Sequence, residues 1–430
     1  MYAVIGAGPM GLATARVLQK HGLPFTGFEL HSGVGGLWDI ANPQSTVYES
    51  AHLISSKRMT EFAEFPMRPE VAPYPRHDEL RRYFTEFAEH FGIAQHYEFS
   101  TRVLRVERAA DGGWDATTES DGRQRTRRFA GVLIATGTLH HPSQPALPGE
   151  FAGTVMHSAQ YKSLDQLRGQ RVLVVGCGNS GADIAVDAVR AAASVDLSVR
   201  RGYWFLPKFL KGKPIDTFGG LIKLPRPIKQ RLDGLMLRLV VGKPSDYGLP
   251  DPDYRLYESH PVMNSLVLHH LAHGDITPRP DIAKVAGHRV SFTDGSSGDY
   301  DTILQATGYA LHYPFIAREA LHWAEGAAAP SLYLNVMHPT DDTLFLMGMV
   351  EASGLGWQGR YEQAEMVALY LKRLAEGHPA ALALQAEKRA QFARRIDGGF
   401  KYLQVDRMAY YVHKDSYLKA LRRHTRALRG

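Results

Sequence analysis

Two similar units dominate the pattern of apolar and polar positions along this chain. The runs 3–5 and 172–175 are short and continuously apolar, which is typical of strands buried in a parallel sheet. A glycine-rich turn follows each run, and the stretches 12–20 and 182–193 beyond the turns carry apolar residues at the helical period. The pattern therefore predicts an α/β fold built on two strand–turn–helix units.

The rest of the pattern predicts smaller elements around these units. Alternation over 96–134, with Asp-Gly turns at 111 and 121, indicates a small antiparallel sheet. Prolines interrupt 203–262, where only 228–241 shows a clear pattern, that of a cationic amphipathic helix. We expect this helix to pack onto its own domain; contact with a membrane surface or a role in substrate access is the alternative. Further helices are predicted over 78–91, 361–376 and 379–395, and a solvated basic helix over 418–429.

Prolines and a repeated tripeptide indicate how these elements are divided into domains. Three prolines between 142 and 148 indicate a hinge. The sequence Ala-Thr-Gly occurs at 135–137 and again at 306–308, as expected if each unit closes with a similar turn. We therefore predict a first domain formed by 1–148 and completed by 311–430. A second domain, 149–310, is inserted into it and carries the poorly patterned insert 203–262.

The glycine turns are the main candidates for chemistry. Both have the pattern Gly-x-Gly-x-x-Gly between an apolar strand and a helix, a context that indicates a dinucleotide site. The glycines permit a tight turn and a close backbone approach, and the helix N-terminus faces the pyrophosphate. Two such sites indicate two nucleotides that exchange electrons, and hence two Rossmann-like domains. The residues are Gly6, Gly8, Pro9, Met10 and Gly11 in the first turn, and Gly176, Gly178, Asn179, Ser180, Gly181 and Asp183 in the second.

The residues at the end of the second strand of each unit distinguish the two nucleotides. Glu29 stands where an acid binds the ribose hydroxyls, and it would repel a 2′-phosphate. The same offset in the second unit leads to Arg200 and Arg201, which would pair with a 2′-phosphate. We therefore expect FAD at the first site and NADPH at the second.

Composition excludes several other classes of protein. The formal net charge is +6, without a basic and aromatic cluster that would indicate a nucleic-acid groove. The single cysteine, Cys177, excludes a redox-active cysteine pair and thus the disulfide reductases. Neighbouring histidines such as His140 and His141 are poorly placed for one metal ion, and no metal site is expected. Without a signal peptide or an apolar run of about 18 residues, we predict a cytoplasmic protein.

A further motif lies between the two fingerprints and carries a family resemblance. Phe151-x-Gly153-x-x-x-His157-x-x-x-Tyr161 resembles the signature of the flavin-containing monooxygenases at every fixed position. Baeyer–Villiger relatives usually end this motif in Trp-Pro, whereas here Lys162 follows Tyr161. Gly35-Gly36-Leu37-Trp38 is similar to the flavin-stacking motif of the family, and 57–66 to its active-site loop. The resemblance implies further cofactor contacts from Gly36, Leu37, Trp38, Ser56, Val103, Thr136, Gly137, Thr307, Gly308 and Gln358.

The resemblance also implies an activity. NADPH would reduce FAD, O₂ would give a C4a-hydroperoxyflavin, and a soft nitrogen or sulfur nucleophile of a small molecule would be oxygenated. Ser55, His157 and Tyr161 are the candidate catalytic residues. One departure stands out, because Ile54 occupies the place of a family asparagine near the flavin, and an aliphatic side chain donates no hydrogen bond.

Two alternatives to this activity stay open. A carbonyl substrate would make the protein a Baeyer–Villiger or oxidative-decarboxylating monooxygenase. The Ile54 departure also fits a protein that consumes NADPH without oxygenating anything, as an oxidase or a redox sensor. A homodimer is a further expectation from the resemblance.

Overall fold

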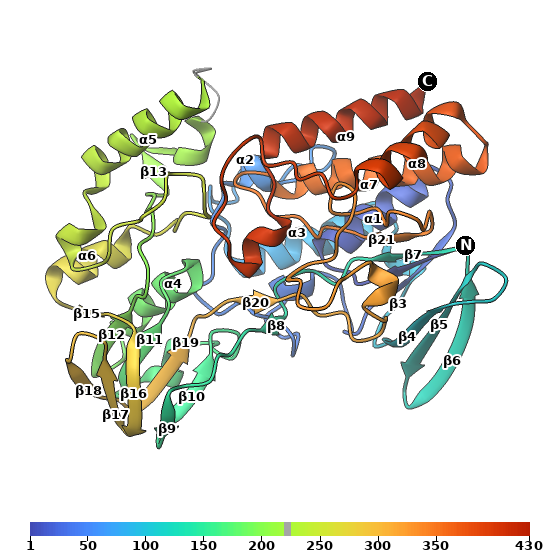
Figure 1. Cartoon of the computed structure of the whole chain (residues 1–430). Coiled ribbons are helices and arrows are strands. Elements are labelled where there is room, and N and C mark those ends of the chain that lie inside the picture. Colours follow the sequence, from blue (N-terminus) through green and yellow to red (C-terminus); the bar gives the residue numbers. More distant parts are fainter. Residues whose placement is uncertain (219–224) are drawn as a thin grey trace.

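The computed structural model describes residues 1–218 and 225–430, and two parallel five-stranded sheets organise them (Figure 1). The first sheet has the order β21-β7-β1-β2-β3, with the predicted apolar strand β1 (Tyr2–Ile5) at its centre. Its strands are short and almost wholly buried because helices cover them, as parallel sheets require. The flanking strands are β2 (Phe25–Phe28), β3 (Tyr97–Glu98), β7 (Gly131–Ile134) and β21 (Leu344–Leu346).

The second sheet has the order β10-β19-β11-β12-β15 and is built only from the middle of the chain. The first sheet instead takes β21 from beyond that region, so the second unit is inserted into the first. The predicted α/β fold with two Rossmann-like domains is thereby confirmed. The second sheet comprises β10 (Thr154–His157), β11 (Arg171–Val175), β12 (Ser194–Ser198), β15 (Ile276–Arg279) and β19 (Thr302–Gln305).

Two chain segments cross between the halves, and they run side by side. The strand β8 (His141–Pro142) pairs with β20 (Tyr309–Ala310) in antiparallel orientation. These strands lie close to the predicted domain limits at 148 and 310, which stay predictions. Smaller sheets flank the two large ones, and the predicted antiparallel sheet is among them. The strands are β4 (Arg102–Arg108), β5 (Trp114–Ser120) and β6 (Arg123–Phe129) in that sheet, and β9 (Gly149–Phe151), β16 (Ile282–Gly287), β17 (Arg289–Phe292) and β18 (Ser297–Asp299) in another.

Helices bury the apolar faces of the sheets. The helix α7 (Gly356–Ala375) is buried along most of its length, against α1 (Pro9–Lys20) on one side and α9 (Lys414–Arg429) on another. The expectation of a solvated tail is wrong, because Tyr417, Leu421 and Leu428 of α9 are buried against this layer. The remaining helices are α2 (Lys57–Thr60), α3 (His77–His90), α4 (Asn179–Ala188), α6 (Leu266–His273) and α8 (Pro379–Gln391).

The insert forms its own small apolar cluster at one edge of the molecule (Figure 1). It holds the hairpin of β13 (Phe209–Leu210) and β14 (Lys213–Pro214) and the predicted amphipathic helix α5 (Arg226–Val241). One side of α5 packs through Leu237 onto Trp204 and Leu256, so the helix is anchored to its own domain as expected. Within 1–218 and 225–430, none of the helices combines the length and the apolar character needed to cross a bilayer.

Candidate active site

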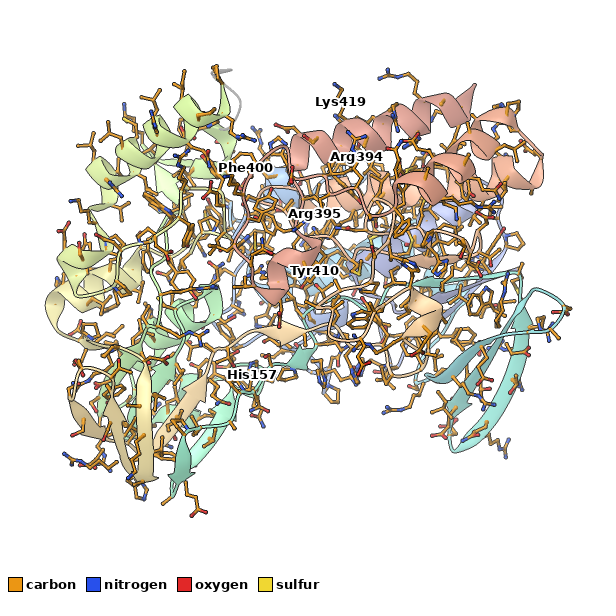
Figure 2. All side chains as sticks on the ribbon, viewed as in Figure 1. His157, Arg394, Arg395, Phe400, Tyr410 and Lys419 are labelled. Atoms are coloured by element: carbon orange, nitrogen blue, oxygen red, sulfur yellow. The ribbon has the colours of Figure 1, made fainter. Side chains whose placement is uncertain are left out.

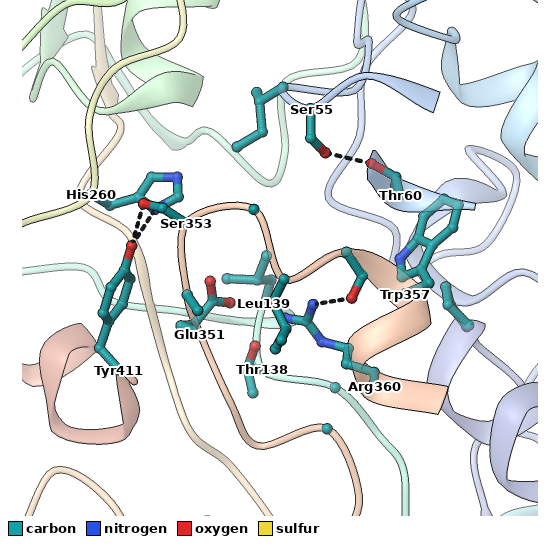
Figure 3. A pocket seen from close by; sticks show the side chains of 18 of the residues that line it. Ser55, Thr60, Thr138, Leu139, His260, Glu351, Ser353, Trp357, Arg360 and Tyr411 are labelled. Atoms are coloured by element: carbon teal, nitrogen blue, oxygen red, sulfur yellow. Dashed lines mark hydrogen bonds between the residues drawn. The ribbon is translucent and has the colours of Figure 1, made fainter. Parts of the chain in front are cut away.

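A single cavity of about 1320 Å³ connects the first glycine turn to the insert. One end is formed by the turn after β1, the end of β2 and the loop before α7. The other end is formed by α5 and the segment 398–415, which approaches the insert from the C-terminal part of the chain. In Figure 3 the wall carries His260 and Tyr411 on one side and Ser55, Thr60 and Trp357 on the other. The cavity is therefore long enough to join a cofactor site to a second compartment beside the insert.

The first glycine turn is shaped by close backbone contacts. A Cβ atom at Gly11 would lie 1.8 Å from the carbonyl oxygen of Gly6, and one at Gly6 would lie 2.7 Å from that of Ala135. Gly6 also has φ +104°, a conformation that L side chains rarely adopt. A Cβ at Gly8, in contrast, would meet only Gly36 at 3.6 Å, and Gly8 lines the cavity. Gly6 and Gly11 thus build the turn, and Gly8 leaves the space into which a pyrophosphate fits.

Glu29 lies at the end of β2 with its carboxylate held by the backbone. It accepts hydrogen bonds from the N–H groups of Ala7 at 2.6 Å and His31 at 2.9 Å. Burial raises the pKa of Glu29, and these backbone donors oppose the shift. Glu29 lines the cavity, and each of its oxygens has a further lone pair with which the oriented carboxylate can accept a ribose hydroxyl.

These residues fit FAD, and most of the predicted flavin contacts share the cavity. Thr136 adds a buried hydroxyl that has no partner among the described residues. Trp38 packs edge-on against Trp357, with ring centroids 6.1 Å apart. Ser56 and Gln358 do not line the cavity. The side chain of Gln358 turns away from it and accepts a hydrogen bond from the N–H of Ala63 at 2.8 Å. The predicted residues that line it are Gly6, Gly8, Pro9, Met10, Glu29, Gly36, Leu37, Trp38, Ser55, Val103, Thr136 and Gly137.

The second glycine turn repeats the geometry of the first. A Cβ at Gly181 would lie 2.0 Å from the carbonyl oxygen of Gly176, and one at Gly176 would lie 2.8 Å from that of Ala306. A Cβ at Gly178 would meet no atom within 4 Å. The turn therefore has the same open position in front of a helix N-terminus, and it fits a second pyrophosphate.

We expect Gly178→Ala to fold normally and retain flavin, because its Cβ meets nothing in the protein. The same methyl group would occupy space that a bound pyrophosphate needs, so the KM for NADPH should rise about tenfold, a loss of about 1.4 kcal/mol. Steady-state kinetics at varied NADPH concentration measures this effect. Gly181→Ala is the matched control, and it should lower the yield of folded protein instead. An unchanged KM in Gly178→Ala would contradict a nucleotide at this turn.

Some of the other predicted residues of the second site already have hydrogen-bond partners in the protein, and others have no ion-pair partner among the described residues. Arg200 and Arg201 follow β12, and neither forms an ion pair with any residue in the described ranges. Asn179 accepts a hydrogen bond from the N–H of Met263 at 2.7 Å and so ties the segment that directly follows the insert to α4. Asp183 accepts bonds from Tyr48 at 3.1 Å and from Asn264 at 2.5 Å, so this carboxylate already has protein partners. Of the remaining predicted contacts, Thr307 donates to the carbonyl oxygen of Ser143, and Gly308 accepts from the N–H of Ser143.

His157 and Tyr161 lie outside the cavity and are fully buried. His157 ends β10 (Figure 2), and its ring meets that of Tyr309 edge-on. Tyr161 donates a hydrogen bond of 2.9 Å to Asp187, a residue of α4. Through these contacts His157 and Tyr161 join the segment between the two glycine turns to the rest of the second domain. The contacts give no support to a catalytic role for either residue.

The Ile54 departure has a local consequence at Ser55. Ile54 and Ser55 both line the cavity, and the Ser55 hydroxyl lies 2.7 Å from that of Thr60. Thr60 donates its one hydroxyl hydrogen to the carbonyl oxygen of Ser56 at 2.8 Å. Ser55 must then donate to Thr60, which leaves only its lone pairs facing the cavity. In this arrangement Ser55 does not replace the missing amide donor.

Sequence reasoning missed a group of polar residues where three distant segments meet. Tyr411 lies 2.7 Å from the hydroxyl of Ser353 and 3.3 Å from Nδ1 of His260 (Figure 3). Burial, helped by the charge of Arg407, lowers the pKa of His260 to about 3, so the ring is neutral near pH 7. Its buried Nε2 has no partner among the described residues. Glu351 lies beside this group, 3.4 Å from Arg407.

Comparisons with known proteins agree with this geometry. The family model described as flavin-binding monooxygenase-like matches residues 1–422. Flavin-containing monooxygenase 2 of Homo sapiens is 30% identical over 397 residues, which cover 87% of this chain and 73% of that protein. The solved structure of OTEMO in complex with FAD and NADP has a TM-score of 0.74 at 19% identity, over 98% of this chain and 97% of that one. The S-allyl-L-cysteine S-oxygenase of Allium sativum has a TM-score of 0.67 at 20% identity, over 99% and 88% of the two chains.

The family match covers nearly the whole chain, and the shared geometry of its two glycine turns fits two dinucleotide cofactors. The chain belongs to the flavin-binding monooxygenase-like family, whose members are FAD- and NADPH-dependent monooxygenases.

Proposed function

We propose that the protein oxygenates a soft nitrogen or sulfur atom of a small molecule, using FAD, NADPH and O₂. The observation that supports the proposal most is the continuity of the cavity. One space extends from the FAD turn to side chains of the insert, among them Leu206, Leu210, Leu237 and Leu256. A small molecule with an apolar body can reach the flavin there without passing through bulk water.

The chain's own residues would bind and orient the reactants. When bound, the two cofactors supply hydride transfer and the activation of O₂. Glu29 and the first glycine turn would hold FAD, and the second turn with Arg200 and Arg201 would hold NADPH. The apolar side chains of the wall would exclude water. Because the reacting nitrogen or sulfur atom is uncharged, the site needs no acidic or basic side chain to orient it. The same reaction consumes NADPH, H⁺ and O₂ and yields NADP⁺, water and the oxygenated product.

The name of one relative favours nitrogen over carbonyl carbon. It is an N-oxide-forming dimethylaniline monooxygenase of Pan troglodytes, at 30% identity. The S-oxygenase named above is 20% identical, so its similarity concerns the fold alone. Similar folds also include cyclohexanone monooxygenase, but at 19% identity this similarity concerns the fold alone. Tyr161-Lys162 in place of Trp-Pro supports the same choice.

Product analysis separates the candidate reactions. The purified holoenzyme is supplied with NADPH, O₂ and, in separate reactions, a thioether, a tertiary amine or a cyclic ketone. We expect sulfoxide or N-oxide as the main product. A lactone from the ketone, without sulfoxide or N-oxide, would favour the Baeyer–Villiger alternative. NADPH consumption without any oxygenated product would favour the oxidase or redox sensor.

His260 is our candidate for the hydrogen-bond donor that Ile54 lacks. If Ser353 donates to Tyr411 and Tyr411 donates to Nδ1 of His260, the neutral ring carries its hydrogen on Nε2, a buried atom without another partner among the described residues. His260→Phe should then raise the peroxide released per NADPH several-fold, without a change in flavin content. Peroxide and NADPH are measured in the same reaction.

Two controls make this prediction specific. His269→Phe changes an exposed histidine of α6 and should release no more peroxide than the wild type. Adding Ile54→Asn to His260→Phe should restore low peroxide release by returning a donor to the cavity. Equal peroxide from His260→Phe and the wild type would show that another group fills this role.

The partners in this proposal are the small-molecule substrate and O₂. A homodimer and a cytoplasmic location remain predictions from the sequence.

A further inference from the structure

Arg407 contributes to the cavity wall a guanidinium group that has few partners in the protein. Its only side-chain hydrogen bond to a described residue is a long one, of 3.4 Å, to Glu351. Its Nε atom is buried and has no partner among the described residues. The side chain as a whole nevertheless keeps 41% of its surface accessible. Since a guanidinium group carries several N–H donors, the described part of the protein leaves most of this donor capacity unused.

The charge of Glu351 does not cancel the positive charge around Arg407. Arg360 lines the same cavity and donates to two backbone carbonyl oxygens, at 3.1 and 2.8 Å (Figure 3). Burial would raise the pKa of Glu351, but the charges of Arg407 and Arg360 outweigh burial and hold this pKa below its ordinary value. Glu351 is therefore ionised near pH 7, and this group carries two positive charges and one negative charge.

The other charged residues of the cavity wall balance one another. With histidines taken as neutral, they are four basic and four acidic side chains. Lys229, for example, forms an ion pair with Asp233. The excess positive charge of the wall is thus located at Glu351, Arg360 and Arg407. Because a buried charge is unfavourable unless an opposite charge pairs with it, this part of the cavity favours an anionic ligand.

Carboxylates and phosphates are the anions that match the planar fork of an arginine. A cofactor phosphate is the less suitable partner for Arg407. Each glycine turn has its own open position for a pyrophosphate, at Gly8 and Gly178, in front of a helix N-terminus. Arg407 instead belongs to the segment 398–415, which forms the end of the cavity away from the first turn. Its position therefore favours an anionic group of the substrate.

Apolar side chains of the insert, such as Leu237 and Leu256, line the same cavity. The cavity therefore combines an apolar surface with one cationic anchor. We propose that Arg407 binds a carboxylate group of the substrate, so that the preferred substrates are thioethers or tertiary amines that carry a carboxylate. This inference rests on the function proposed above and specifies the class of substrate.

Calorimetric titration of the oxidised, flavin-loaded enzyme tests the proposal. The two ligands are (phenylthio)acetate and (phenylthio)acetamide, which share a thioether and an apolar ring and differ in charge. We expect the acetate to bind at least about tenfold more tightly than the amide, because only the acetate forms charge-assisted hydrogen bonds with Arg407. Arg407→Met should remove this difference in Kd between the two ligands.

Two further variants make the test specific to the guanidinium group. Arg407→Lys keeps a positive charge beside Glu351, so it should fold even if Arg407→Met does not. It should lose part of the preference for the acetate, because lysine lacks the planar fork. Arg394→Met removes the same charge from an exposed position outside the cavity (Figure 2), and it should keep the wild-type preference.

Equal Kd values for the two ligands in the wild type would overturn the proposal, as would a wild-type preference in both Arg407 variants. Loss of FAD from a folded Arg407 variant that keeps the preference would assign the guanidinium group to a cofactor phosphate instead. The titration needs neither NADPH nor O₂. A missing carboxylate preference and a missing oxygenated product are therefore separate results, and the first does not contradict the proposed reaction.

Discussion

Glu29→Ala is expected to purify with most of its flavin lost. The variant removes the carboxylate that the N–H groups of Ala7 and His31 hold toward the cavity. Hydrogen bonds to a charged group contribute about 1.5–3 kcal/mol each. Losing two of them to the ribose corresponds to a rise of at least about 100-fold in the Kd for FAD. Titration of the apoprotein with FAD, followed by flavin fluorescence, measures the change.

Glu98 provides the control for this effect. It lies on the neighbouring strand β3 and pairs with Arg127 at 2.6 Å, and its side chain is 42% exposed. Glu98→Gln should keep the wild-type affinity for FAD. Circular dichroism checks that Glu29→Ala is folded, since the variant also leaves two backbone donors without their partner. A folded Glu29→Ala protein with wild-type flavin content would refute the assigned ribose contact.

Replacing both Arg200 and Arg201 with alanine is expected to abolish the preference for NADPH over NADH. The two arginines follow β12 at the position predicted to bind a 2′-phosphate, and no described residue forms an ion pair with them. Loss of two charge-assisted hydrogen bonds corresponds to about 3 kcal/mol. The kcat/KM for NADPH should therefore fall about 100-fold, and that for NADH should change little.

The comparison of the two nucleotides makes this experiment specific to the phosphate. Arg190→Ala, which removes an exposed arginine just beyond α4 in the same domain, should leave both values unchanged. An equal fall for NADPH and NADH in the double variant would show that the arginines support the domain instead. If the ratio of kcat/KM for NADPH to kcat/KM for NADH is unchanged, the 2′-phosphate binds elsewhere.

The elements around the two turns were predictable because their signals are local. The runs at 3–5 and 172–175 are strands, and Gly6 and Gly176 adopt the same left-handed conformation, with φ +104° and +99°. Ala135 and Ala306 contact these two glycines in the same way, which explains the repeated Ala-Thr-Gly. A pattern within one strand–turn–helix unit thus carries most of the information needed to form it.

The distal part of the cavity was not predictable because it depends on contacts between remote segments. Tyr411 approaches Ser353 and His260 only after the C-terminal segment, the loop before α7 and the insert have come together. The periodicity of apolar residues along the sequence contains no information about such long-range contacts. Gln358 illustrates the same limit on one helix, since the rotation of α7 directs Trp357 to the cavity and Gln358 to Ala63.

Oxygen transfer itself is tested most directly by turnover of a thioether under ¹⁸O₂. The account predicts a sulfoxide that carries one ¹⁸O atom, formed in an amount close to that of the NADPH consumed. Hydrogen peroxide equal to the NADPH consumed, with no labelled sulfoxide or N-oxide from any substrate tested, would contradict it and make the protein an oxidase.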